Sequence, residues 1–425
     1  MYISEIELKN VRCCKHLLLP FQGKPGSTLI IGDNGDGKTT VLRSIGMGLC
    51  DESSAAALLR DLHGDLVREE ADEALIRVTL KASKGVHYRI DTKIRELKAF
   101  ERVSQEVFRR RGSQWKRLRE DQFPWEEIFV SGYGAGTRTQ GTADYQYYIP
   151  VDAVYPLFKY DMPLQNPELA LRRIVEEASA RGRSAETKHR RRGTMQEYLL
   201  QLLKSLLMLE AKDTVLLTAT GLEVKSHRWG QIELSALGDG YKATTTWILD
   251  LLSWWMLYLQ LENKSLYSNR DIAGVVIIDE MEQHLHPRWQ LRICELLKGL
   301  FPKVQFIVAT HSPLVVSGCE NTPIYALHRG RHTTKSAYGW LPEDVLREIM
   351  GLGRVRPAAV SNRIEMYEKL HLKSLQRDIS KTEKAQLRRM RRVIHSYRGA
   401  DQDVLMRELG NLVKQLKAVS KREKK

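Results

Sequence analysis

The stretch TLIIGDNGDGKTT at residues 28–40 decides how this chain folds. It predicts a short buried strand, then a glycine-rich turn that matches G-x-x-x-x-G-K-[ST] over residues 32–39, then the start of a helix. In such a turn the glycines let successive backbone N–H groups point at phosphate oxygens, and the helix N-terminus adds positive partial charge. A glycine-rich turn without a ligand is the alternative, but the position between a strand and a helix favours a nucleotide phosphate site.

The side chains of this loop have separate expected roles. Lys38 reaches the β- and γ-phosphates of ATP as a catalytic cation, and Thr39 offers its hydroxyl to Mg²⁺. The residues of the loop that we expect to bind the nucleotide are Gly32, Asn34, Gly35, Gly37, Lys38, Thr39 and Thr40.

The composition is that of a globular protein with two or three domains, because 42% of the residues are apolar and 28% are charged. The net charge of +15 indicates either a polyanionic partner or a solubilising surface.

The cysteines form neither a C-x-x-C pair nor a framework, which predicts a reducing cytoplasm and incidental or structural thiols at Cys13, Cys14, Cys50, Cys294 and Cys319. We expect no signal peptide and no membrane span, and the apolar run 247–259, interrupted by Asp250, predicts a buried helix.

Periodicity predicts most of the elements. Alternating apolar residues indicate paired strands at 2–8 and 16–21, and a hairpin of strands 74–82 and 86–94 around a turn at 83–85. Further strands are expected at 128–133, 215–217, 232–234, 274–279 and 304–309, and helices at 51–73, 167–180, 194–210 and from 342 onward. The basic runs 109–119 and 181–192, the second expected to be an exposed loop, are either solvated surface or phosphate contacts.

Two more groups of residues point to the same chemistry. The buried strand 275–278 ends in Asp279, which would hold Mg²⁺ through water, and Glu280, which would act as general base for a water nucleophile. His311, at the end of the next strand, could donate a hydrogen bond to the γ-phosphate, although a lone histidine is more often a surface or core residue. Alone, an acidic pair at a strand end is a weak signal, but after the phosphate loop it is a strong one.

The stretch LGDGYK at 237–242 opens the long apolar helix. Its exposed backbone amides at Gly238, Asp239 and Gly240 suit a phosphate from a second nucleotide site. An ordinary turn into a helix is an equally good interpretation of this stretch taken alone.

Taken in this order, the motifs resemble ABC-type ATPases of the RecF/SMC/OLD-like branch. Asn10-Val11-Arg12, GDNGDGKTT, LGDGY, VVIIDEMEQHLHP and ATHSP match that branch across most of residues 1–340. The resemblance implies two heads that sandwich two ATP molecules, each phosphate loop facing the other head's signature loop, LGDGY. It also implies that Arg12 touches the phosphates and that the residues near the dimer seam are Glu282, His284, His286 and Pro287.

The chain departs from the branch at two places. The branch usually carries a serine where this chain has Gly238, so either Ser235 substitutes for it or hydrolysis is slow. The branch's glutamine loop has no clear match, and Gln140, after the glycine-rich loop 133–136, is a candidate for it. The short spacing between Arg138 and the signature loop leaves no room for a long coiled-coil arm.

The expected fold is α/β: an ABC-type ATPase head with a helical insertion and a C-terminal helical region. The domain boundaries are an N-terminal lobe at 1–125, a helical lobe with a basic loop at 126–230, a C-terminal lobe at 231–340 and a helical region at 341–425. Within the last region, Leu387, Met390 and Ile394 share one helix face, and residues 414–425 form a basic tail.

Outside the head, three segments are similar to ATPase subunits of the Septu, PARIS and retron–Septu anti-phage systems. They are GYGAGTR at 132–138, residues 157–168 and residues 343–347. No nuclease signature is apparent, and we reject Asp401-Gln402-Asp403 as metal-binding acids because they lie in a polar helical context. The resemblance therefore implies a cytoplasmic homo-oligomeric ATPase switch, binding ATP and Mg²⁺, that controls a separate nuclease or toxin.

Two other functions stay open. A RecF-like DNA-repair ATPase would account for the net charge, with nucleic acid as its partner. A non-hydrolysing nucleotide sensor or scaffold would account for the missing signature serine.

Overall fold

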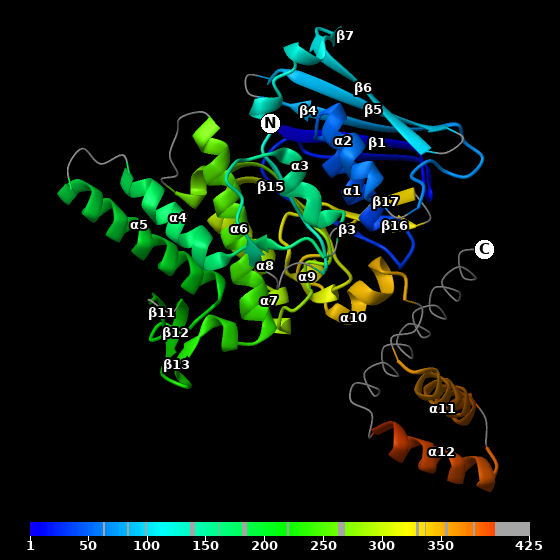
Figure 1. The fold of residues 1–425 in the computed structure, drawn as a ribbon. Helices are drawn as coiled ribbons and strands as arrows, with labels where there is room; N and C mark the ends of the chain where they lie inside the picture. The colour runs from blue at the N-terminus through cyan, green and yellow to red at the C-terminus, as the bar shows by residue number, and fades with distance from the viewer. Residues whose placement is uncertain are drawn as a thin grey trace. The chain divides into compact units, whose positions relative to one another are not determined.

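A computed structural model describes residues 1–62, 64–82, 85–97, 100–136, 141–159, 161–180, 185–218, 221–261, 268–328, 331–335, 337–352, 356–376 and 379–395. The chain divides into two compact units, Met1–Val345 and Leu346–Lys425 (Figure 1). Within the described residues, no helix is long and apolar enough to cross a membrane. The finer division of residues 1–340 into three lobes stays a prediction.

A largely parallel six-stranded sheet carries the phosphate loop. Its order is β17-β16-β3-β15-β14-β8, and only the β16–β17 pair is antiparallel. The strands are β3 (Gly26–Ile31), β8 (Val130–Tyr133), β14 (Ala273–Ile278), β15 (Lys303–Ala309), β16 (Ile324–His328) and β17 (Arg331–Lys335). The central strands are continuous apolar runs because both faces of a parallel sheet are covered. The α/β prediction is confirmed.

The second sheet is antiparallel and contains the predicted hairpins. Its order is β2-β1-β4-β5-β6-β7. The strands are β1 (Tyr2–Val11), β2 (Cys14–Pro20), β4 (Glu73–Lys81), β5 (His87–Leu97), β6 (Phe100–Arg111) and β7 (Gln114–Leu118). The alternation in β1 buries Ile3, Ile6 and Leu8 completely, as a sheet with one face on a core requires.

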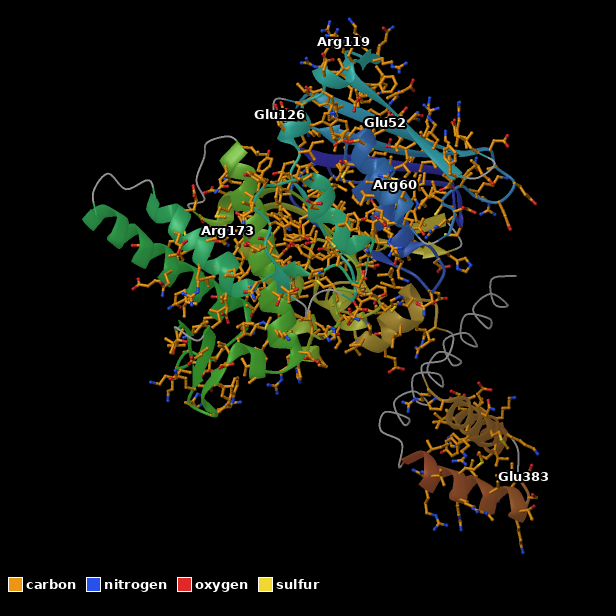
Figure 2. All side chains as sticks on the ribbon, in the orientation of Figure 1. Glu52, Arg60, Arg119, Glu126, Arg173 and Glu383 are labelled. Atoms are coloured by element: carbon orange, nitrogen blue, oxygen red, sulfur yellow. A yellow bond between two sulfur atoms is a disulfide. The ribbon has the colours of Figure 1, made fainter. Side chains whose placement is uncertain are left out.

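Helix α1 (Lys38–Gly48) contacts both sheets, and helix α2 (Glu52–Arg60) contacts β6 of the antiparallel sheet. Both helices contribute residues to one continuous hydrophobic core. Asp51 caps α2 by accepting a hydrogen bond from the Ser54 backbone. Glu52 of α2 reaches the antiparallel sheet and accepts a hydrogen bond of 2.8 Å from the Gln105 backbone N–H (Figure 2).

Gln305 of β15 joins the two sheets through its buried side chain. Its Oε1 accepts from the Ile3 backbone N–H at 2.7 Å, and its Nε2 donates to the Ile3 carbonyl at 2.9 Å. We expect Gln305→Ala to lower the free energy of unfolding by about 2–3 kcal/mol, because both backbone groups would lose a partner in a buried site. Urea denaturation would measure this, with exposed Gln114→Ala as the control; equal stabilities of the two variants would contradict it.

A helical region follows β8 and ends in the signature loop. It contains α3 (Pro150–Val154), α4 (Pro167–Ala180), α5 (Ala185–Leu206) and a small sheet of β11 (Thr214–Leu217), β12 (Leu222–Ser226) and β13 (Gly230–Glu233). Two short strands, β9 (Gly141–Ala143) and β10 (Leu164–Gln165), pair with each other. Figure 1 shows α4 and α5 side by side, with the small sheet near α5.

Helix α6 (Asp239–Leu261) is the buried helix that the apolar run predicts, and every residue from Ala243 to Leu259 is buried. Asp250 on this helix accepts hydrogen bonds from the Tyr133 hydroxyl at 3.0 Å and the Gln165 backbone N–H at 2.9 Å. Because Tyr133 ends β8, this network ties the helix behind the signature loop to the sheet that carries Asp279.

The remaining helices of the first unit are α7 (Pro287–Gln290), α8 (Ile293–Leu300), α9 (Pro313–Gly318) and α10 (Pro342–Asp344), followed by a π-helical turn at Val345–Ile349. The second unit holds α11 (Ala358–Gln376) and α12 (Lys381–His395). Ile364, Tyr367 and Ile394 are buried between these two helices, with Leu387 and Met390 packed against them. The predicted shared face of α12 is confirmed.

Several expectations about the elements are wrong. The helix expected at 51–73 ends at Arg60, since Gly64 and Glu70 take positive φ angles that a helix excludes. Residues 185–192, expected as a loop, belong to α5, because alanine, glutamate, lysine and arginine all favour helix. Strand β12 was not predicted, and Arg109–Arg111 and Lys116 lie on β6 and β7.

The expectation of unpaired thiols is also wrong. Cys294 on α8 and Cys319 after α9 form a disulfide, with their Cα atoms 5.5 Å apart. The other three cysteines are free. The bridge is not visible in the sequence because 25 positions separate the two residues and only the packing of α8 on α9 brings them together.

Candidate functional site

The phosphate loop closes around the ammonium group of Lys38. The Lys38 Nζ donates to the carbonyl oxygens of Gly32 and Asp33, both at 2.9 Å, and the Asp36 carboxylate accepts from the Asp33 N–H at 2.8 Å. Burial lowers the pKa of Lys38, against the pull of nearby carboxylates, of which Glu280 is the strongest. Hydrogen bonds between side chains and backbone groups of the same loop therefore fix its shape, with the Lys38 ammonium group at its centre.

Gly37 must be glycine for two reasons. Its φ of +97° is in the left-handed region, and a Cβ there would lie 2.6 Å from the Cys13 sulfur. Cys13 was not predicted as a site residue. A hydrogen bond shared with Cys14 lowers the pKa of Cys13 to about 7, so a thiol with thiolate character lies directly against the phosphate loop.

A cavity of about 310 Å³, which we call the nucleotide cavity, lies at the carboxyl ends of the parallel strands. It is lined by Arg12, Cys13, Asn34, Gly35, Gly37, Lys38, Thr39, Thr40, Glu280 and His311. Most side chains predicted for ATP binding and chemistry thus come together in one place. Arg12 enters from the turn after β1, where its guanidinium donates to the carbonyls of Asp65 and Gly64, each at 3.2 Å.

Thr39 and Asp279 fit a magnesium site beside this cavity. The Thr39 hydroxyl donates to the Asp279 carboxylate at 2.7 Å, although 240 positions separate the two residues. A hydroxyl and a single carboxylate are the protein ligands that Mg²⁺ commonly takes at a nucleotide, with phosphates and waters supplying the rest. No group of three or more His, Cys, Asp or Glu side chains within the described ranges could hold a different metal.

Glu280, the second residue after β14, takes the left-handed conformation, with φ +51°. One of its carboxylate oxygens lies 3.4 Å from the His311 Nε2. Burial raises the pKa of Glu280 to about 7, reinforced by the carboxylates of Glu282 and Asp279. Burial also lowers the pKa of His311, with the Lys38 charge adding to the effect. The site therefore combines a carboxylate of raised basicity with a neutral imidazole.

Glu282 holds the His311 loop in place. Its carboxylate accepts from the Thr310 hydroxyl at 2.6 Å and from the His311 backbone N–H at 2.5 Å. Sequence reasoning put Glu282 at a dimer seam and missed this contact within one chain.

The signature loop lines a different cavity. Gly238, Asp239 and Gly240 border a space of about 550 Å³, which we call the signature cavity. Its other lining residues are Met208, Leu209, Glu210, Asp213, Arg228, Trp229, Tyr241, His284, His286, Arg288, Trp289 and Arg292. The two cavities share no lining residue. The Ser235 side chain, Arg138 and Gln140 lie outside the described parts of the chain.

Family models match two segments of the chain. Residues 5–130 match a model described as an AAA domain, and residues 236–317 match one described as "AAA domain, putative AbiEii toxin, Type IV TA system". The segments cover the phosphate loop and the signature-to-His311 region respectively.

Among curated proteins, Septu protein PtuA of Bacillus mycoides is 24% identical over 327 residues, which cover 75% of this chain and 39% of that protein. Septu protein PtuA of Bacillus thuringiensis is 30% identical over 152 residues, 33% of this chain and 37% of that protein. The Retron Vc95 probable ATPase of Vibrio cholerae is 38% identical over 87 residues, 20% of this chain and 16% of that protein.

These matches relate the chain to ABC-type ATPases of anti-phage defence systems. The alignments span 39% or less of the length of these relatives. Among solved structures, an SMC head bound to a winged-helix domain of ScpA is 16% identical, with a TM-score of 0.47 and coverage of 79% of this chain and 98% of that chain. RecF is 14% identical, with a TM-score of 0.41 and coverage of 79% and 98%.

Proposed function

We propose that this ATPase is a switch in which ATP binding joins two copies of the chain and hydrolysis separates them. One observation carries the proposal. Lys38, Glu280 and His311 line the nucleotide cavity, whereas the signature glycines line a separate cavity of the same chain. Because the two cavities are separate, the signature loop of a chain is poorly placed to reach the phosphates bound by that same chain. A second copy can bring its signature loop to the phosphates that the first copy binds.

The side chains of the nucleotide cavity divide the reaction among them. Lys38 holds the β- and γ-phosphates, while Thr39 and Asp279 hold Mg²⁺, which when bound would neutralise charge on the phosphate oxygens. Glu280 accepts a proton from the attacking water, and neutral His311, positioned by Glu282, donates a hydrogen bond to the γ-phosphate.

The pKa of Glu280 predicts how hydrolysis depends on pH. A protonated carboxyl cannot take a proton from water, so we expect kcat/KM for ATP to fall about tenfold for each pH unit below about 7. Above that pH the value should level off. Steady-state rates between pH 5.5 and 8.5 would measure the profile; a constant kcat/KM from pH 8 to pH 6 would contradict the assignment of Glu280 as the base.

The switch is proposed to control a separate nuclease or toxin in the cytoplasm. The proposal is supported by the relatives, which are named as Septu protein PtuA and as probable ATPases of retrons.

The effector can be sought by co-expressing the chain with the products of its neighbouring genes and purifying it with ATP–Mg²⁺ and without it. A stable complex whose yield changes with ATP is expected for the wild type, and loss of that ATP dependence for Lys38→Ala. Recovery of the chain alone, with ATP–Mg²⁺ and without it, would contradict the proposal that it controls a separate effector protein.

DNA binding is a second candidate function, favoured by basic side chains on the exposed β6–β7 hairpin. Arg110, Arg111 and Lys116 are exposed there, and Figure 2 shows Arg119 projecting beyond the same end of the sheet. A dissociation constant for duplex DNA that rises steeply with salt would favour a RecF-like role. Weak binding to duplex DNA even at low salt would rule out this role.

A further inference from the structure

The signature cavity is lined by charged side chains of both signs, and only one of its arginines forms an ion pair among the described residues. Three arginines and two histidines line it, against Glu210, Asp213 and Asp239. Glu210 forms an ion pair with Arg228 and lies 3.4 Å from the His227 ring, while Asp213 contacts the other nitrogen of that ring. In the described part of the chain, no carboxylate lies within ion-pair distance of Arg288 or Arg292. These two guanidinium groups are therefore exposed charges beside a row of backbone amides.

Packing fixes Arg288 relative to the signature glycines. A Cβ at Gly240 would lie 2.4 Å from the His284 carbonyl oxygen, so the loop rests directly on the segment that follows Glu280. Next to Gly240 and five positions after His284, the Tyr241 and Trp289 rings meet edge to face with centroids 4.9 Å apart. Trp289 is buried and Arg288 immediately precedes it on α7, which places the arginine at the rim of the same cavity.

Gly238 stands where the resemblance leads us to expect a serine, so the signature loop has no hydroxyl at this position. The position therefore has no side chain to contact a phosphate. Arginine is suited to the missing contact because its planar guanidinium can donate two parallel hydrogen bonds to phosphate oxygens. The side chain that makes this contact must be exposed, free of a carboxylate partner and close to the glycines.

We propose that Arg288 of one copy contacts the γ-phosphate of the ATP held by the other copy, in place of the absent serine. The inference rests on the proposed ATP-joined dimer and names the residue that completes its composite site. Arg228 is excluded because Glu210 already holds it. Arg292 is a weaker candidate because it also lines an adjoining apolar groove with Leu291 and Tyr338.

Arg288 acts by stabilising charge in the transition state. Charge moves onto the phosphate oxygens as the bond to the leaving group breaks, so a guanidinium that arrives only in the closed dimer would couple dimer closure to hydrolysis. We expect Arg288→Ala to lower the hydrolysis rate on the order of 10²-fold. Arg288→Lys should retain part of the rate, and exposed Arg270→Ala serves as the control with an unchanged rate. The melting temperature should stay the same in all three variants, because these side chains are exposed.

A mixing experiment tests whether Arg288 acts across the dimer. Lys38→Ala lacks a working phosphate loop but keeps Arg288, whereas Arg288→Ala has the opposite defect. In the mixed dimer, one site combines the intact phosphate loop of one copy with the intact Arg288 of the other. Mixing two nearly inactive proteins in equal amounts should therefore raise the hydrolysis rate about tenfold or more above that of either protein alone, since each mixed dimer carries one complete site of its two.

The outcomes separate this inference from the proposed function. If the wild type hydrolyses ATP but Arg288→Ala does so equally well, or if mixing restores nothing, the trans assignment of Arg288 is overturned and the switch remains. If the wild type shows neither hydrolysis nor ATP-dependent dimers, both proposals fall. If the wild type forms ATP-dependent dimers without turnover, Arg288→Ala should raise the ATP concentration needed for dimers at least tenfold, and an unchanged concentration would overturn the inference.

Discussion

Glu280→Gln is expected to lower the rate of ATP hydrolysis by about 10²- to 10⁴-fold while ATP still binds. Glutamine has nearly the same shape as glutamate but cannot accept a proton from water. It also removes a partly buried charge and its repulsion from Glu282 and Asp279, which together raise the pKa of Glu280, so affinity for ATP should not fall. Phosphate release and the binding of a fluorescent ATP analogue would measure the two quantities separately.

The matched control for this variant is Glu320→Gln. Glu320 is an exposed glutamate of the same unit and lies outside the nucleotide cavity, so its loss of charge should leave the rate unchanged. A Glu280→Gln rate within twofold of the wild type would rule out Glu280 as the base. Loss of ATP binding in that variant would instead assign Glu280 to nucleotide affinity.

Asp250→Ala is expected to lower the free energy of unfolding by about 3 kcal/mol or more. The change leaves two buried donors, the Tyr133 hydroxyl and the Gln165 N–H, without their acceptor and opens a cavity in α6. Chemical denaturation would measure the loss. A variant as stable as the wild type would show that the network does not hold α6 to the sheet.

Asp250→Asn separates the charge of this side chain from its hydrogen bonds. Burial raises the pKa of Asp250 to about 7, against the hydrogen bonds that lower it. Between about pH 4 and pH 7 the folded protein then keeps a proton that the unfolded chain has released, so stability from this group decreases as pH rises through that window. The asparagine variant lacks this decrease, and its stability relative to the wild type should rise from pH 4 to pH 7. A constant difference would contradict the raised pKa.

Local patterns in the sequence were sufficient to predict the main strands of the two large sheets and the phosphate loop. The alternation in β1 and β4 predicts burial on one face, the apolar runs of β3, β14 and β15 predict burial on both, and the structure confirms both patterns. In β5 the alternation is interrupted, because Asp91 is buried as well as Ile90 and Thr92. The helix at 185–192 was missed because its basic side chains suggested a solvated loop, whereas the backbone preference of the same residues favours helix.

Contacts between distant segments could not be read from the sequence. The Cys294–Cys319 bridge, the Glu282 contacts to Thr310 and His311, and the packing of Cys13 on Gly37 all depend on how the strand ends meet. The only sequence signal for Cys13 was its position beside Arg12, which the resemblance already placed near the phosphates. Arg288 had no signal apart from following Pro287.

The most direct test of the account is the mass in solution of Glu280→Gln with ATP–Mg²⁺ and without it. This variant should hold ATP without consuming it, so closed dimers would accumulate. We predict that the mass doubles when ATP–Mg²⁺ is added, and that the same addition leaves Lys38→Ala unchanged. A mass of Glu280→Gln that does not depend on ATP would contradict the claim that the nucleotide joins two copies of the chain.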